Sequence, residues 1–342
     1  MSLCSLVFFL FYSPYPTNNN PPHPPHPPLP RPIVQEHLHL RPSIPKFANH
    51  GTSRCLPFVT DDLIEEAVKR NESCRTFAPF PRSRTRISTV SVTYGERKEH
   101  IQKALQTHII HNIIHGNDMH VMCNPIVDDL WNKPAFILSV LLEQMLLPPE
   151  ERYEWLFWAD RDTIILDQCR PTSSFLPPEG SDSGADTPNL VVTSDANGLN
   201  NGVFLLRVSD WAIELFEDIL AFRFYNPDAD LRFTEQSAME NVIRMDRFIN
   251  NVAMVPQEWF NGYPNSEFGP EKFRDRNNTM GLEDFQVRRG DFIVHFAGPW
   301  DKDEPMLEWE RVIRNMTNVW EMNKVQRHLD GDVQAFWREW GY

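Results

Sequence analysis

Two aspartates separated by one residue form the first candidate chemical site. Asp160 and Asp162 interrupt an otherwise apolar, strand-like segment, WLFWADRDTIILD. Alternate side chains of an extended chain share one face, so both carboxylates can reach one hard divalent cation such as Mg²⁺ or Mn²⁺. Because unpaired buried carboxylates are costly, either a metal or Arg161 with other basic groups must compensate them, and the context favours the metal. Similar triplets at 228/230 and 301/303 lie in polar or charged loops and are interpreted as solvated.

A second polar group lies in the segment TSDANGLNNG, at 193–202. Its amides and carboxylate offer directed hydrogen bonds, and its two glycines let the backbone approach a ligand closely. The alternative is a polar turn before the strand at 203–208. Because five polar groups exceed what a turn requires, we favour a binding site. Its candidate residues are Asp195, Asn200, Asn201 and Gly202.

A third candidate is a histidine inside an apolar strand, in the segment FIVHFAG. A histidine in such a position is most often a hydrogen-bonded core residue, and that alternative stays open for His295. Gly298, three residues later, permits a phosphate to approach backbone N–H groups at the end of the strand. His295 is therefore a candidate third metal ligand beside the two aspartates.

The elements that must position these residues alternate between strands and helices. Helix 135–147 is apolar on nearly all sides and is expected to be buried, and Thr234 is expected to cap helix 235–245. This alternation predicts an α/β fold with a mainly parallel sheet flanked by helices. The expected strands are 87–93, 120–123, 155–158, 163–166, 189–193, 203–208 and 292–296, and the other helices are 97–115, one capped by Ser209, and 304–328.

The N-terminal part differs in composition from the rest. Residues 1–13 include an apolar run of about ten, too short to span a bilayer, and are interpreted as a remnant anchor or signal. Residues 14–57 hold 13 of the 29 prolines and are typical of an extended stem or linker. An N-terminal extension at 58–85 and a single catalytic domain at 86–342 follow.

Composition limits the partners and the location. The net charge of the 342 residues is −14, from 33 basic and 47 acidic residues, which argues against nucleic acid as a partner. Cys55 and Cys74 flank a short segment outside the expected core, and they either pair with each other or stay free thiols. Three N-x-S/T sequons permit a secretory location. These sequons begin at Asn71, Asn277 and Asn315.

Together, these motifs resemble those of a nucleotide-sugar glycosyltransferase of the GT-A architecture. The chain most resembles the fungal α-galactosyl/α-mannosyl transferase family, whose plant relatives are xyloglucan xylosyltransferases (glycosyltransferase family 34). The resemblance covers about residues 88–313, roughly two-thirds of the chain. The matching segments are WLFWADRDTIILD, DANGLNNGVFLLRVSDWA, TEQSA, VPQEWFNGYP and GDFIVHFAG.

The resemblance implies a metal-dependent hexosyltransferase. Asp160, Asp162 and His295 are expected to hold Mn²⁺ (or Mg²⁺), which bridges the donor diphosphate. The resemblance also implies retention at the anomeric carbon, with Glu235 and Gln236 as the catalytic pair; their alternative role is to satisfy a helix N-terminus. The residues expected to line the donor and acceptor site are Lys133, Asn201, Glu235, Gln236 and Gly298.

The expected partners are a nucleotide-sugar donor, UDP-galactose or GDP-mannose, and a glycan or glycoprotein acceptor. A larger transferase complex or a homo-oligomer is a further expectation. The expected location is the Golgi membrane, with a luminal catalytic domain. Two other functions stay open: a metal-dependent phosphohydrolase, for which the sequence shows no second compact Asp/His group, and a degenerate, non-catalytic binding subunit, which loss of a metal ligand would favour.

Overall fold

The computed structural model describes residues 44–178, 187–265, 269–298 and 300–342. The expected apolar segment at 1–13 and most of the expected stem therefore lie outside the described residues. Within the described ranges, no helix is both long enough and apolar enough to span a bilayer.

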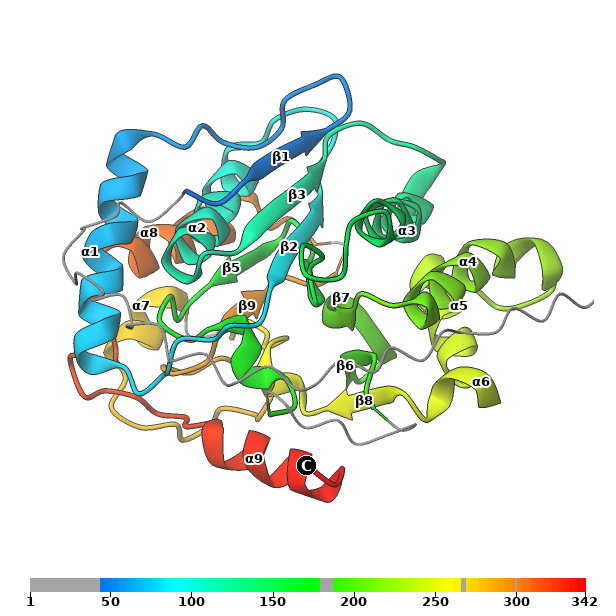
Figure 1. Cartoon of the computed structure of the whole chain (residues 1–342). Coiled ribbons are helices and arrows are strands. Elements are labelled where there is room, and N and C mark those ends of the chain that lie inside the picture. The colour runs from blue at the N-terminus through cyan, green and yellow to red at the C-terminus, as the bar shows by residue number, and fades with distance from the viewer. Residues whose placement is uncertain (1–43, 179–186, 266–268, 299) are drawn as a thin grey trace, which may run out of the picture. The chain divides into compact units, whose positions relative to one another are not determined.

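A seven-stranded sheet forms the centre of the fold, in the order β1-β3-β2-β4-β7-β6-β8 (Figure 1). Neighbouring strands run parallel except at β7, which is antiparallel to both β4 and β6. The mainly parallel sheet confirms the predicted α/β class and is consistent with the GT-A architecture. The strands are β1 (Phe47–His50), β2 (Ile87–Val92), β3 (Asp118–Met122), β4 (Trp155–Ala159), β6 (Leu190–Asp195), β7 (Gly198–Arg207) and β8 (Val252–Val255).

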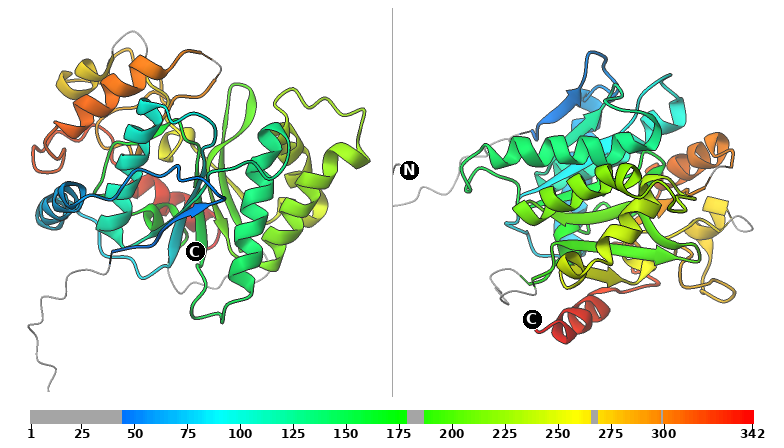
Figure 2. Two further views of the ribbon diagram at one scale, coloured as in Figure 1. Left: turned by 90° about the horizontal axis from the view of Figure 1, so that it is seen from above. Right: turned by 90° about the vertical axis from the view of Figure 1, so that its right-hand side faces the viewer.

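Helices cover both faces of this sheet, as the two views of Figure 2 show. On one face α2 (Glu99–His115) packs against β3, and α1 (Asp61–Phe77) and α8 (Asp303–Arg314) pack against α2. The other packs against α3 (Asn132–Met145), α4 (Asp210–Tyr225) and α5 (Glu235–Ile243). The remaining α-helices of the described residues are α6 (Asp246–Ile249), α7 (Gly269–Asp275) and α9 (Asp330–Glu339).

Local sequence signals explain where several of these helices begin and end. Ser209 Oγ accepts a hydrogen bond from the Ala212 backbone N–H and so caps α4, as predicted. Thr60 caps α1 in the same way, through the N–H of Leu63. Gly116 ends α2 with a φ of 75°, a left-handed conformation that glycine adopts without steric cost.

A separate two-stranded sheet brings distant parts of the chain together. β5 (Thr163–Ile165) pairs antiparallel with β9 (Ile293–His295), and Thr163 lies directly opposite His295. The backbone N–H of Phe296 donates to the carbonyl oxygen of Asp162 at 2.9 Å. This pairing places the histidine predicted as a metal ligand beside the second aspartate.

The folded region starts earlier than the predicted boundary at residue 57. β1 pairs with β3 at the edge of the sheet, and α1 packs against α2, so residues 47–50 and 61–77 belong to the same compact unit as the rest. Neither expected state of Cys55 and Cys74 is observed. Cys55 instead forms a disulfide with Cys123, and Cys74 forms one with Cys169.

Two helices differ from their predictions. α3 is not buried on all sides, because it packs between the sheet and α4 and leaves a third side to solvent, where Leu142 is 47% exposed. The predicted helix at 304–328 ends at Arg314, and helical structure resumes only at Asp330. The intervening chain follows the surface, where Trp320 Nε1 donates to the Asp167 carboxylate at 2.9 Å.

Candidate functional site

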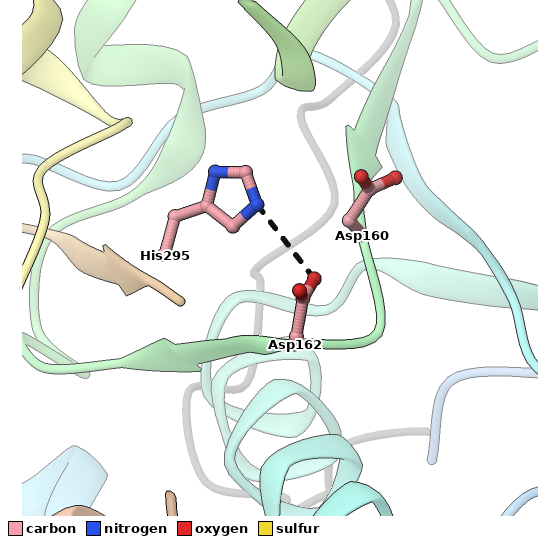
Figure 3. A group of neighbouring side chains, drawn as sticks. All are labelled: Asp160, Asp162 and His295. Carbon is pink, nitrogen blue, oxygen red and sulfur yellow. Dashed lines mark ion pairs between the residues drawn. The ribbon is translucent and has the colours of Figure 1, made fainter. Parts of the chain in front are cut away.

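Asp160, Asp162 and His295 point toward one another beyond the end of β4 (Figure 3). One ligand atom from each lies within 4.8 Å of the other two. The sequence suggested that the two aspartates share one extended strand, but in the structure they do not. β4 ends at Ala159, a turn follows, and β5 begins at Thr163. The turn allows Asp162 to face His295, with 3.6 Å between Asp162 Oδ1 and His295 Nε2.

A hydrogen bond from His295 to Asn261 determines which ring nitrogen of His295 is free. Asn261 Nδ2 donates to Thr193 Oγ1 at 2.8 Å and to Asn200 Oδ1 at 3.0 Å, so Asn261 Oδ1 must act as an acceptor. His295 Nδ1 lies 2.7 Å from this oxygen and therefore carries the proton. Nε2 then presents its lone pair to Asp162, as a metal ligand must.

Burial keeps the His295 ring neutral. The ring is nearly inaccessible, and burial lowers the pKa of His295 although the carboxylates of Asp162 and Asp160 oppose the shift. Gly202 makes room for it, because a Cβ atom at that position would lie 2.2 Å from His295 Cε1. Gly202 was predicted to let a bound molecule approach the backbone, and in the structure it leaves space for the ring of His295, a candidate metal ligand.

Asn200 holds the two residues that contact His295, Asn261 and Gly202, through hydrogen bonds. Its Oδ1 accepts from Asn261 and from the Gly202 N–H, and its Nδ2 donates to Asp195 and to Tyr263 OH. The amide therefore has both donors and both acceptor positions used inside the protein. Asn200 lines the cavity in which it was predicted to bind a ligand, and its amide also positions the residues around His295.

Lys133 connects the first aspartate to the predicted catalytic glutamate. Its Nζ atom lies 3.0 Å from Asp160 Oδ1 and 3.6 Å from Glu235 Oε1, and it also donates to Asn201 Oδ1 at 2.9 Å. Burial lowers the pKa of Lys133, but the carboxylates of Asp160 and Glu235 outweigh burial and raise the pKa. Lys133 therefore stays positively charged at the floor of the site.

Lys302 forms an ion pair with the second aspartate, as Lys133 does with the first. Its Nζ donates to Asp162 Oδ2 at 2.6 Å and to the Phe296 carbonyl oxygen at 2.7 Å. Burial by itself raises the pKa of Asp162, whereas His295 and the Lys302 ammonium group lower it, and the net pKa lies below the usual range. Asp162 is therefore an ionised carboxylate despite its burial.

The start of α5 is unusual. Thr234 was predicted to cap the helix, but its side chain makes no capping hydrogen bond and its φ is 52°, which is strained for a β-branched residue. Glu235 follows it, almost fully buried, and its Oε2 has no hydrogen-bond partner among the described residues. Burial raises the pKa of Glu235, and Lys133 opposes this only in part.

All the site residues predicted from the sequence line one cavity of about 740 Å³. It extends from Val92 and Tyr94, beyond the carboxyl end of β2, to Tyr263 and Ala297. The predicted residues in its lining are Lys133, Asp160, Asp162, Asp195, Asn200, Asn201, Gly202, Glu235, Gln236, His295 and Gly298. By contrast, Asp228 and Asp230 are exposed, as expected for a solvated pair.

The sequence reasoning missed three residues that act within this site. Asn261 and Tyr263 lie in the segment VPQEWFNGYP, which carried the family resemblance without an assigned role. Lys302 lies four residues after Gly298 in a run of charged residues, where a solvated lysine is the ordinary interpretation. Only the β5–β9 pairing shows that this segment turns back toward Asp162.

The donor set fits a divalent cation. Two ionised carboxylates and one neutral imidazole are ligands that Mn²⁺ accepts, and carboxylate oxygens also suit Mg²⁺. The hydrogen bond to His295 Nδ1 is the kind of outer contact that orients metal-binding histidines. Asp160 is held in the same manner, since Trp158 Nε1 donates to its Oδ1 at 2.8 Å.

The sequence shares its central region with a known family. Residues 179–304 match the model of the galactosyl transferase GMA12/MNN10 family. This span contains the polar segment before β7, the start of α5 and His295 with Gly298. This part of the chain is therefore similar to that family.

Curated relatives point to glycosyltransferases as well. The chain is 25% identical over 197 residues to an uncharacterized alpha-1,2-galactosyltransferase of Schizosaccharomyces pombe, covering 49% of this chain and 47% of that protein. It is 23% identical over 214 residues to a probable alpha-1,2-galactosyltransferase of the same yeast, covering 54% and 58%. It is 29% identical over 124 residues to glycosyltransferase 6 of Arabidopsis thaliana, covering 34% and 26%.

The chain thus spans about half of the yeast relatives and about a quarter of the plant one. Among solved structures, it is similar to a glycosyltransferase involved in the glycosylation of the major capsid of PBCV-1. That match has a TM-score of 0.48 and 15% identity, and it covers 66% of this chain and 99% of the other.

Proposed function

We propose that this chain is a retaining, metal-dependent glycosyltransferase of the GMA12/MNN10 family. It transfers a hexose from UDP-galactose or GDP-mannose to a glycan or glycoprotein acceptor and forms an α-linkage. The names of the two yeast relatives favour galactose as the transferred sugar. The observation that carries the proposal is the convergence of Asp160, Asp162 and His295 in one cavity with Lys133 and Glu235.

Charge explains why such a site suits a nucleotide-sugar. A nucleoside diphosphate brings two or more negative charges into a protein whose net charge is −14. Lys133 and Lys302 place two ammonium groups at the cavity, each paired with a carboxylate that is a candidate metal ligand. A cation held by Asp160, Asp162 and His295 supplies further positive charge that stabilises the diphosphate as it leaves.

The protein's own groups orient the reacting sugar. Gln236 Oε1 accepts from the Asn201 backbone N–H at 3.2 Å, which fixes the amide, and its Nε2 forms no hydrogen bond within the described residues. That group is free to donate to a sugar hydroxyl. Glu235 lines the cavity, and its Oε2 has no hydrogen-bond partner among the residues that the structure describes, so its charge is available to stabilise a developing oxocarbenium ion.

These positions favour retention on one face of the sugar. In that route the departing phosphate oxygen accepts the proton of the acceptor hydroxyl, while Glu235 and Gln236 stabilise the positive charge at the anomeric carbon. Double displacement instead requires a carboxylate that attacks this carbon from the opposite face. We assign Glu235 the stabilising role because its side chain is buried and its Oε1 atom is paired with Lys133 Nζ at 3.6 Å.

The anomeric configuration of the initial product tests the proposal. The purified chain is incubated with Mn²⁺ and UDP-galactose, GDP-mannose or UDP-xylose, together with mannose and galactose oligosaccharides, and products are followed by NMR. UDP-galactose or GDP-mannose should give an α-linked product. A β-linked product from either of these α-linked donors means inversion and contradicts the proposal.

We also propose a luminal, Golgi-type location for this domain. Two disulfides support it, because such bonds persist in oxidising compartments and are rare in the cytosol. The sequon asparagines Asn277 and Asn315 are both exposed and accessible to glycosylation. Expression in a eukaryotic host should give a mass shift that endoglycosidase removes, and that Asn277→Gln with Asn315→Gln reduces. An unglycosylated, cytosolic product would contradict the location.

A further inference from the structure

A second hollow adjoins the catalytic cavity. It has a volume of about 480 Å³ and shares Tyr263, His295 and Ala297 with the cavity described above. The shared residues form the boundary between the two. A molecule bound across this boundary would therefore contact both hollows at once.

Aromatic and proline side chains dominate the lining of the second hollow. Trp300 is 41% exposed, yet it is anchored, because its Nε1 donates to the Ala297 carbonyl oxygen at 2.8 Å. The ring of Phe296 lies 6.1 Å from that of Trp300, centre to centre, and Trp309 packs behind Phe296. The other residues of the lining are Pro264, Asn265, Gly269, Pro270, Pro305 and Glu308.

This lining suits a neutral sugar ring. A pyranose has an apolar C–H face that packs on an indole or phenol ring, and hydroxyls around its edge that need polar partners. Trp300 offers an exposed, fixed indole, and Glu308 is an exposed carboxylate at the rim. Among the described residues of the lining, the ionisable side chains are Glu308, His295 and the Tyr263 phenol. None of them is a lysine or arginine, so a charged phosphate is a poor match.

The position of the hollow indicates which substrate occupies it. Nucleotides bind beyond the carboxyl ends of parallel strands in open α/β sheets, which here is the end of the cavity lined by Val92 and Tyr94. The second hollow adjoins the opposite end, at Tyr263. A donor that extends from Tyr94 to the metal ligands leaves this side for the acceptor.

Building on the proposed function, we propose that the second hollow is an acceptor subsite. It binds a sugar ring of the glycan acceptor one or more residues away from the reacting hydroxyl, with Trp300 as the stacking platform. This subsite favours oligosaccharide acceptors over monosaccharides, because a monosaccharide fills only the catalytic cavity.

The test compares acceptors of two lengths on the full chain with Mn²⁺ and UDP or GDP bound. The probes are methyl α-mannoside and methyl α-galactoside against mannotriose and galactotriose, with dissociation constants measured by calorimetry. For at least one sugar, the trisaccharide should bind the wild type about tenfold more tightly than the monosaccharide. Trp300→Ala should remove this advantage, and Trp300→Phe should restore part of it.

Two controls separate this subsite from the catalytic function. Tyr225→Ala removes an aromatic side chain that is 82% exposed on α4, and it should keep the trisaccharide advantage. Trp300→Ala should still hydrolyse the donor, which needs no acceptor, so absent donor hydrolysis in the wild type counts against the proposed function and not against the subsite. The subsite is overturned if Trp300→Ala keeps the advantage, or if the wild type binds the trisaccharides no better than the monosaccharides.

Discussion

Asn261 Oδ1 lies 2.7 Å from His295 Nδ1, and this contact sets the proton position on the ring. Both hydrogens of the Asn261 amide are committed elsewhere, to Thr193 and Asn200, so the asparagine cannot reverse its role without losing two hydrogen bonds. The free Nε2 atom facing Asp162 is thus a consequence of a polar network that extends to β6 and β7. A metal site that depends on this network should be sensitive to changes outside its own ligands.

Asn261→Ala should weaken metal binding without removing a ligand. Loss of an outer hydrogen bond to a ligating histidine typically costs about 10- to 100-fold in metal affinity or activity. We expect the Mn²⁺ concentration for half-maximal transfer to rise by this factor, with most activity restored at high Mn²⁺. Asn226→Ala, at the end of α4, is the control and should leave the Mn²⁺ requirement unchanged. An unaltered requirement in Asn261→Ala would show that His295 needs no such support.

Glu235→Gln should separate activity from stability. Because Glu235 is buried with one unpartnered oxygen and a raised pKa, a neutral amide should leave the free energy of unfolding unchanged or higher. Transfer should fall by about 100- to 1,000-fold, as for other groups that stabilise a charged transition state. Glu240→Gln, on the same helix and paired with Arg244, should keep wild-type activity.

Azide tests the role assigned to Glu235 more closely. In Glu235→Ala, a charge-stabilising role predicts slow transfer that azide does not rescue. Rescue by azide, with a glycosyl azide of inverted configuration, would identify Glu235 as a covalent nucleophile and contradict the single-face route.

Peptide mapping under non-reducing conditions should recover Cys55 linked to Cys123 and Cys74 linked to Cys169. Each disulfide closes a long loop, of 68 and 95 residues in sequence separation, and joins the N-terminal segment to chain that follows a strand, at Cys123 after β3 and at Cys169 after β5. Breaking one by Cys74→Ser with Cys169→Ser should therefore lower the free energy of unfolding by about 2–5 kcal/mol. A peptide that links Cys55 to Cys74 would show that the N-terminal segment is attached differently.

Stability should fall at mildly acidic pH because of buried histidines on α2. Burial lowers the pKa of His108 and of His115 to about 4, below the ordinary value of 6.5 that applies in the unfolded chain. Between these values the unfolded chain binds more protons, so the stabilisation is complete above pH 6.5 and declines toward pH 4. Each residue contributes a slope of about 1.4 kcal/mol per pH unit.

Urea denaturation at pH 7.5, 6.0 and 5.0 measures this slope. His108→Gln removes one titrating group and retains a donor toward Thr163, whose Oγ1 lies 2.9 Å from the histidine Nε2. The variant should show a shallower loss of stability on acidification. An identical slope in both proteins would mean that His108 does not titrate with unfolding.

Local patterns in the sequence were enough to predict much of the fold and which residues line the site. The β-branched run at 87–93 and the cap at Ser209 correspond to β2 and α4, since these depend on neighbouring residues. The disulfide partners were not predictable, because Cys55 and Cys123 meet only after β1 pairs with β3. The role of Lys302 was hidden for the same reason.

The site also brings the predicted metal ligands together through a geometry other than the expected one. Asp160 and Asp162 were expected on one face of an extended strand, but a turn separates β4 from β5 between them. The strain at Thr234 has no signature in the sequence either, since a threonine before Glu235 is also an ordinary capping residue. Both features depend on contacts between segments that are distant in the chain.

Metal dependence of sugar transfer tests the central claim most directly. The chain is stripped with EDTA, and transfer from UDP-galactose and GDP-mannose to oligosaccharides is measured before and after Mn²⁺ is restored, in the wild type, Asp162→Asn and Asp230→Asn. We predict that chelation lowers transfer by at least about 100-fold, that Mn²⁺ restores it in the wild type and in Asp230→Asn, and that Asp162→Asn stays inactive while folded. Undiminished transfer in excess EDTA, or full activity of Asp162→Asn, would contradict the account.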